Sequence, residues 1–308
     1  MTLEQLLPIF ASTVAAATPL IIAALGVLVS ERAGVLNLGV EGMMLIGAVT
    51  AFVVGVSSGS LVLGYLAAMT AGAAVALIFA VLVLSLQTNQ VATGLALALF
   101  GIGLSAFVGQ SFVGTPIERL PALEIPLLSD IPLLGPLLFH YDIVVYGSFF
   151  LFAAVSWFLY RSRLGLRLRA IGESPAVAHS LGEPVIRIRY LATLFGGAMS
   201  GLAGAYLSTA LTPMWVEGMS AGRGWIVLAL VVFATWRPLR VLLGAYLFGG
   251  VTVLQLHAQG FGVGVPSEFL SMLPYLATIV VLVLICRDPK AILLNQPASL
   301  GRSFHPDA

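Results

Sequence analysis

The side chains that could bind a solute are few in this chain, and they lie beside or within long apolar runs. They comprise four amides, two carboxylates and one indole: Asn37, Glu41, Asn89, Gln90, Trp215, Glu217 and Gln255. Amide and aromatic groups suit a neutral, planar, hydrogen-bonding solute better than an ion. We therefore regard these residues as candidates for lining the path of such a solute.

Each candidate also has a purely structural interpretation, and both interpretations stay open on the sequence alone. Asn37 could cap a broken helix. Glu41 and Glu217 could accept hydrogen bonds from free backbone N–H groups at helix starts, where negative charge is favoured. Trp215 could be an anchor at the membrane interface. The remaining three amides could shape a turn or pair with a neighbouring helix.

Patterns for catalysis and metal binding do not occur in the sequence. There is no H-E-x-x-H, and the four histidines are far apart. The phosphate-binding pattern G-x-x-x-x-G-K-[ST] is excluded because Lys290 is the only lysine. The single cysteine, Cys286, excludes an intramolecular disulfide and a thiolate metal cluster. The sequence therefore predicts no enzyme, and any ATP that drives this protein must be bound by another chain.

The elements that carry the candidate residues must be membrane helices. Of 308 residues, 59% are hydrophobic and only 9% are charged, whereas a soluble domain has about 25% charged residues. This composition excludes a soluble globular protein, a disordered chain and a nucleic-acid binder with a basic face. The middles of the expected helices hold essentially no ionisable groups, which disfavours an ion-coupled carrier.

Apolar runs and helix breakers predict an all-α polytopic membrane protein with about nine transmembrane helices, some of them broken or re-entrant. The whole chain, 1–308, is expected to form one transmembrane domain. The run at 224–237 is short enough for a half-helix. The expected crossings are 8–29, 42–57, 61–86, 90–110, 142–160, 190–211, 224–237, 240–257 and 269–286.

The distribution of positive charge predicts the orientation. If the loop 161–189 is cytoplasmic, twelve of the 14 Lys and Arg residues lie on that side, and Arg119 and Arg223 lie outside. The N-terminus is then outside and the C-terminus is cytoplasmic. The proline-rich segment 111–141 is expected to be an outer loop, which either meets a partner or simply connects two helices.

A short internal repeat suggests two halves of inverted topology. Val40-Glu41-Gly42-Met43 is expected near the inner face, and Val216-Glu217-Gly218-Met219 near the outer face. Both segments are interrupted by glycines, and such paired interruptions point to a transport pathway. Glycines at four-residue spacing elsewhere, as at Gly197 and Gly201, predict close helix packing within the chain or at a subunit interface.

The loop 161–189 contains a short, well-capped helix. Ser174 suits the N-cap, Pro175 the first helical position and Gly182 the left-handed residue after the end. Such a helix at the membrane surface could dock into a groove on a soluble partner. The alternative is a passive loop whose arginines bind lipid headgroups.

Three segments resemble the nucleoside and simple-sugar permeases of ABC importers, within the larger branched-chain amino acid, ribose and nucleoside permease superfamily. They are residues 30–48 (SERAGVLNLGVEGMMLIGA), Asn89-Gln90-Val91 with Gly94, Ala96 and Leu97, and the loop from Gly165 to Gly182. The resemblance covers about residues 8–290. Thr88 departs from the small or basic residue expected before Asn89.

The resemblance implies a function and a set of partners. The chain is similar to the shorter permease of a nucleoside uptake system, which translocates nucleosides or purine-like solutes inward across a bacterial cytoplasmic (inner) membrane. Riboflavin or simple sugars are alternative solutes, and a secondary transporter or channel is an alternative class. The implied partners are a second, longer permease in a heterodimer, an ABC ATPase that binds ATP and Mg²⁺ so that this chain needs no cofactor, and an extracytoplasmic substrate-binding lipoprotein.

The resemblance also identifies 161–189 as the coupling loop that docks on the ATPase. The residues that would make or shape this contact are Arg169, Gly172, Glu173, Ser174, His179 and Gly182. In the implied cycle of alternating access, this loop transmits ATP-driven closure of the ATPase to the membrane helices.

Overall fold

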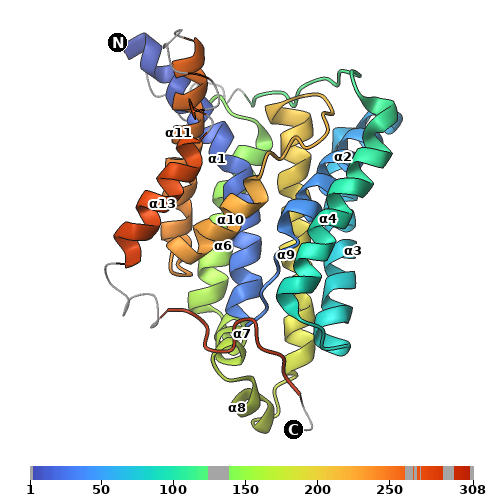
Figure 1. Cartoon of the computed structure of the whole chain (residues 1–308), viewed down its shortest axis with the longest axis vertical. Coiled ribbons are helices and arrows are strands. Elements are labelled where there is room, and N and C mark those ends of the chain that lie inside the picture. The colour runs from blue at the N-terminus through green and yellow to red at the C-terminus, as the bar shows by residue number, and fades with distance from the viewer. Residues whose placement is uncertain are drawn as a thin grey trace.

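The computed structural model describes residues 3–123, 139–260, 266, 269–270, 272–286 and 295–305. Within these ranges the chain is helical, and its β-bridges are isolated pairs. The long helices are α1 (Leu3–Arg32), α2 (Val40–Ser58), α3 (Leu61–Ala80), α4 (Gln90–Gly109), α6 (Ile143–Arg161), α9 (Val185–Tyr206) and α11 (Pro238–Gly260). Figure 1 shows one bundle, with the N-terminus at one end and the C-terminus at the other. The expected all-α class is confirmed.

Shorter elements complete the bundle. α3 and α9 each continue into a π-helical turn, and α4 ends in a 3-10 turn. These elements are η1 (Val81–Ser85), η2 (Gln110–Phe112), α7 (Arg163–Glu173), α8 (Pro175–Ser180), η3 (Leu207–Leu211), α10 (Arg223–Phe233) and α13 (Leu273–Cys286).

Seven segments are long and apolar enough to cross a membrane, and they correspond to seven of the nine expected crossings. The other two are shorter. α10 has 11 residues and α13 has 14, so at 1.5 Å per residue α10 is about 16 Å long, against about 30 Å of hydrocarbon. The helix within 224–237 is therefore too short to cross the membrane alone, as expected for either a half-helix or a re-entrant segment. In the expected crossing 269–286, residue 271 lies outside the described residues.

The proline-rich segment 111–141 is described only in part. Residues 113–123 form no helix, and Pro116 and Pro121 lie there, as expected from their fixed φ and missing N–H. The other three prolines of the segment, at 126, 132 and 136, lie outside the described residues.

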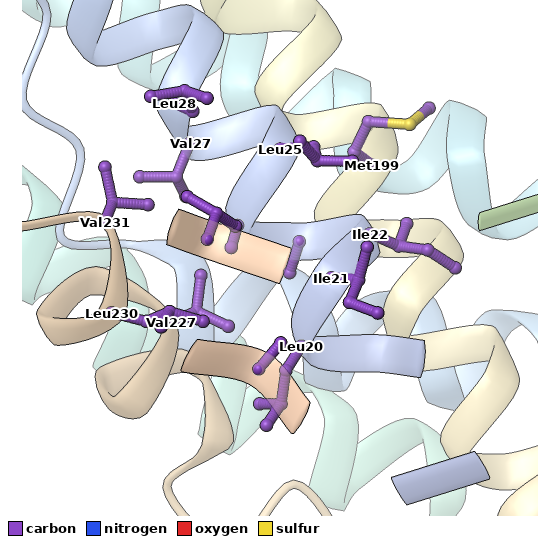
Figure 2. Packing of buried hydrophobic residues seen from close by; sticks show 14 of the residues in the cluster. Leu20, Ile21, Ile22, Leu25, Val27, Leu28, Met199, Val227, Leu230 and Val231 are labelled. Carbon is purple, nitrogen blue, oxygen red and sulfur yellow. The ribbon is translucent and has the colours of Figure 1, made fainter. Parts of the chain in front are cut away.

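The core of the bundle is centred on α1. Its segment from Leu20 to Val29 is almost wholly buried, as expected for a helix that is apolar on every side. Figure 2 shows these side chains between Met199 of α9 and Val227 and Leu230 of α10. The apolar sequence of this segment of α1 is therefore explained by contact with protein on all sides and not with lipid.

Glycines let α9 approach its neighbours closely. A Cβ atom at Gly204 would meet the carbonyl oxygen of Met44 on α2, and one at Gly201 would meet the carbonyl oxygen of Ala68 on α3. Small residues permit this approach where lipid supplies no hydrophobic drive between helices. The expected packing within the chain is thus confirmed for these positions.

This packing predicts different effects for two helical glycines. Gly204→Ala should lower the free energy of unfolding by about 1–3 kcal/mol, because its methyl group overlaps the Met44 carbonyl. Gly103→Ala on α4 is the matched control, since a Cβ there meets nothing within 4 Å. It should leave stability unchanged or raise it by up to about 1 kcal/mol through helix propensity. Thermal unfolding in detergent measures both, and equal destabilisation by the two changes would contradict the packing.

Candidate functional site

Two helices start inside the bundle, and their N-termini meet. α2 begins against the middle of α4, where a Cβ at Gly42 would meet the backbone of Leu97 and Ala98. α10 begins beside α2, where a Cβ at Gly224 would lie 2.6 Å from the backbone nitrogen of Glu41. We call these two adjoining helix starts the interior junction. Figure 1 shows α10 midway along the height of the bundle.

Glu41 joins the two helix starts. Its side chain is 5% exposed. Its Oε1 accepts hydrogen bonds from the Ser220 hydroxyl at 2.5 Å and the Gly222 N–H at 3.0 Å, and its Oε2 accepts from the Gly224 N–H at 2.6 Å. The first N–H groups of a helix have no partner within that helix, and its N-terminus carries partial positive charge. Glu41 therefore caps α10 from the start of α2.

The N-terminus of α10 needs a hydrogen-bond acceptor from another segment of the chain. Gly222 is the N-cap residue of α10, has a φ of 78° and supplies no side chain to accept a hydrogen bond. Gly224 has no room for a side chain, because Glu41 fills the space. The glycines seen in the sequence as interruptions thus admit one carboxylate to the backbone of α10.

Asn37 shapes the turn that leads into α2. Its Oδ1 accepts a hydrogen bond from the Gly39 N–H at 2.8 Å, and Gly39 is the N-cap residue of α2. The same loop is held by Gln90 at the start of α4, whose Oε1 accepts from the Leu36 N–H at 2.8 Å. Both amides therefore bond to the backbone, which agrees with their structural interpretation.

The other predicted pathway residues lie away from the interior junction. Asn89 is exposed and caps α4 by accepting from the Ala92 N–H at 3.0 Å. Glu217 is exposed in the connection between η3 and α10. Gln255 is partly buried on α11. The structure thus groups Asn37 and Glu41 around the start of α2 and does not gather the predicted set into one site.

Trp215 is buried, with 1% exposure, and packs against α4. A Cβ atom at Gly109 would meet its ring nitrogen. Its Nε1 donates to no acceptor among the described residues. The interpretation as an exposed interfacial anchor is therefore wrong for this residue, because the indole lies inside the protein.

Sequence reasoning missed a second group of polar contacts, which lies at the C-terminal end of α1. Glu31 Oε2 accepts from the indole N–H of Trp236 at 2.5 Å, and Arg32 donates to the Trp236 carbonyl from Nε at 3.2 Å and from Nη2 at 2.7 Å. Thr235 and Trp236 both have positive φ, 48° and 52°. These bonds hold the tight turn between α10 and α11. The available signal was a Glu-Arg pair at the end of a long apolar run.

The expected capped helix in the loop 161–189 is confirmed as α8. The Ser174 hydroxyl accepts from the Val177 N–H at 3.4 Å, Pro175 is the first helical residue, and Gly182 has a φ of 83°. His179 and Glu173 are exposed on this surface. The side chains of His179 and Glu173 are therefore available to a partner protein.

Two other residues of this loop have internal contacts. The Arg169 guanidinium carbon lies 5.2 Å from the centroid of the Tyr160 ring. Gly172 is buried, and a Cβ there would meet the Arg32 carbonyl oxygen. Gly172 therefore places α7 directly on the end of α1.

The C-terminal segment 295–305 folds back over the end of the bundle that carries α7 and α8. The Gly172 carbonyl accepts from the Ser299 N–H at 2.9 Å and its hydroxyl at 2.7 Å, and Arg189 Nη2 donates to Ser299 Oγ at 3.0 Å. The Phe304 ring contacts His179 edge-on, with 5.7 Å between centroids. This segment joins α7, α8 and α9, and nothing in its local sequence indicates that role.

Comparison of the sequence with known proteins identifies the family of this chain. Residues 9–285 match the family described as branched-chain amino acid transport system / permease component. The chain is 42% identical to a putative glucose ABC transporter permease of Haloferax volcanii, over 96% of both chains. It is 33% identical to the guanosine ABC transporter permease of Bacillus subtilis (92% of this chain, 93% of that protein) and 34% identical to the nucleoside ABC transporter permease of Lactococcus lactis (87% and 88%).

No solved structure is significantly similar to this chain. The family match covers most of the sequence, and three full-length relatives exceed 30% identity. The chain is therefore a multi-pass membrane protein that belongs to the branched-chain amino acid transport system permease family, whose members are non-catalytic membrane components of ABC transporters.

Proposed function

We propose that this permease translocates neutral, sugar-containing solutes inward, with nucleosides and related purine-like compounds as its first class. The observation that carries this proposal is the hydrogen bonding of the Glu41 carboxylate. This interior carboxylate already accepts three hydrogen bonds from the protein. It is therefore not free to bind the ammonium group of an amino acid, the solute that the family description names. Guanosine and nucleoside permeases are among the full-length relatives.

Simple sugars are the second candidate class. They are favoured by the 42% identity to a putative glucose permease, which exceeds the identity to the two nucleoside permeases. A nucleoside and a sugar share hydroxyl groups and lack net charge. An interior junction whose carboxylate is already hydrogen-bonded by the protein suits both, and riboflavin remains an alternative of the same chemical kind.

The proposed mechanism is alternating access driven by a separate ATPase, which binds ATP and Mg²⁺. Movement of α8 passes to α7, whose Gly172 packs on the end of α1. Arg32 at that end bonds to the Trp236 carbonyl, just after α10. The other end of α10 is held to α2 by Glu41. A continuous series of contacts therefore links the surface helix to the interior junction, and α10 is the element that would move.

The proposed assembly contains a second, longer permease, the ATPase and an extracytoplasmic binding lipoprotein. We place the end of the bundle with α7, α8 and the C-terminus in the cytoplasm, and the N-terminus outside. This orientation is supported by the arginines of 161–189, since cytoplasmic loops carry an excess of positive charge.

Uptake by the reconstituted assembly tests the solute class. With the ATPase and the binding protein present, guanosine should accumulate in vesicles only when ATP is supplied. Leucine should not accumulate, because the Glu41 carboxylate that could pair with its ammonium group is already hydrogen-bonded to the protein. Radiolabelled guanosine, glucose, riboflavin and leucine compared side by side give the measurement. Accumulation of leucine but of no neutral solute would contradict the proposal, and glucose alone would favour the second class.

Exposed residues of α7 and α8 should matter for docking of the ATPase and not for folding of the permease. Combined Glu173→Ala and His179→Ala should lower both capture of the ATPase and solute uptake, because both side chains are exposed beside α8. The abundance of the permease in membranes should not change. Glu118→Ala is the control, since this exposed carboxylate lies in the connection after α4, before α6. Normal ATPase capture by the double variant would remove the proposed docking surface.

A further inference from the structure

A basic cavity opens at the inner end of the bundle, and the transport mechanism proposed above makes no use of it. It has a volume of about 820 Å³ and lies between the ends of α1 and α6, α7 and the start of α11. Three arginines line it, Arg32, Arg169 and Arg237, together with a single carboxylate, Glu173. The cavity therefore carries a surplus of positive charge.

These arginines are not neutralised by the described part of the protein. Arg32 is 7% exposed and donates to the carbonyl oxygens of Trp236 and Asn295, which are uncharged. Arg237 donates to the Asn295 side chain at 3.3 Å. None of the three forms a salt bridge with a carboxylate in the described ranges. Burying an arginine whose hydrogen-bond partners are neutral is costly, and the one carboxylate of the cavity, Glu173, faces three arginines, so the arrangement favours an anion in the cavity.

Two buried donors in the cavity wall also lack a partner. The Arg169 Nε and the Ser156 Oγ are inaccessible and make no hydrogen bond within the described residues. Buried polar groups are normally paired, and the exceptions require a physical reason. A phosphate group accepts hydrogen bonds from guanidinium and hydroxyl groups alike. The unpaired donors are thus of the type that such a group would use.

The shape of the cavity indicates that the anion has an apolar tail. Phe152, Ser156 and Tyr160 lie at four-residue spacing on one face of α6 and all line the cavity. Phe152 is nine residues before the end of α6 at Arg161, which places it about 13 Å into the span. Leu166 and Leu239 also line the cavity and are 60% and 61% exposed. A soluble anion would leave this apolar wall unused.

We propose that this cavity binds an anionic phospholipid, with the phosphate among Arg32, Arg169 and Arg237 and an acyl chain along the face of α6 that carries Phe152. Basic pockets between membrane helices are suited to such headgroups. A bound lipid would contact α7, the end of α1 and the start of α11 together. It would thereby stabilise the hydrogen bonds that join Glu31 and Arg32 to Trp236.

Native mass spectrometry of the purified, delipidated full-length chain tests this site. Titration with phosphatidylglycerol should show binding well above that of phosphatidylcholine. The double variant Arg169→Gln, Arg237→Gln should bind phosphatidylglycerol about twenty-five-fold more weakly, at roughly fivefold for each arginine lost near an anionic headgroup. Arg163→Gln, Arg187→Gln is the matched control, because both arginines are exposed nearby and outside the cavity. It should retain full binding.

Three results would overturn the proposal. Unchanged phosphatidylglycerol binding by the Arg169, Arg237 double variant would show that the lipid binds elsewhere. Displacement of the lipid by excess inorganic phosphate would make the cavity a site for a free anion. Loss of ATPase capture with unchanged lipid binding would make it part of the docking surface. Thermal unfolding of each variant, equal to that of the parent, establishes that the changes act on binding and not on folding.

Discussion

Two helix starts inside one bundle create the constraint on which this structure depends. The first N–H groups of a helix have no internal partner, and hydrocarbon offers none. α2 and α10 begin beside one another, so two partial positive charges meet in the interior. Glu41 lies in the first turn of α2, and its carboxylate accepts hydrogen bonds from the Ser220 hydroxyl and the N–H groups of Gly222 and Gly224 at the start of α10. This charged acceptor satisfies the N–H groups at the start of α10, which have no partner within the helix.

Other features of the bundle follow from this junction. The glycines of α10 admit the carboxylate, and those of α2 and α9 admit the neighbouring backbones. The far end of α10 is fixed in turn by Arg32 and Glu31 on Trp236. α10 is thus held at both ends by polar side chains from other elements and is too short to cross the membrane alone. An element of that kind can shift as a unit while the long helices keep their packing.

The sequence predicted local features well, because local chemistry determines them. Apolar runs located seven long helices, charge and prolines located the loops, and Ser174 and Gly182 delimited α8. Contacts between distant segments were not predictable in this way. The hydrogen bonds from Ser299 to Gly172 and from Arg32 to Trp236 join residues more than 100 positions apart. Neither hydrophobic periodicity nor the spacing of motifs in the sequence identifies such pairs of residues.

The two copies of the repeated Val-Glu-Gly-Met segment illustrate the same limit. Both glutamates were plausible caps of interior helix starts. Glu41 is buried and serves as one, whereas Glu217 is exposed before the start of α10. The four residues are identical, so the difference comes from the surrounding helices. Similarly, Asn37 and Gln90 were identified as notable amides, but their bonds to backbone N–H groups became evident only with the fold.

Comparing the two glutamates gives the most direct test of the central claim. Glu41→Gln replaces one acceptor oxygen with a donor that faces backbone N–H groups, whereas Glu217→Gln alters an exposed side chain. ATP-driven solute uptake at equal protein abundance is the measurement. We predict that Glu41→Gln lowers uptake at least tenfold, since hydrogen bonds to charged groups contribute about 1.5–3 kcal/mol, and that Glu217→Gln has no effect. Uptake by Glu41→Gln equal to that of Glu217→Gln would contradict the account.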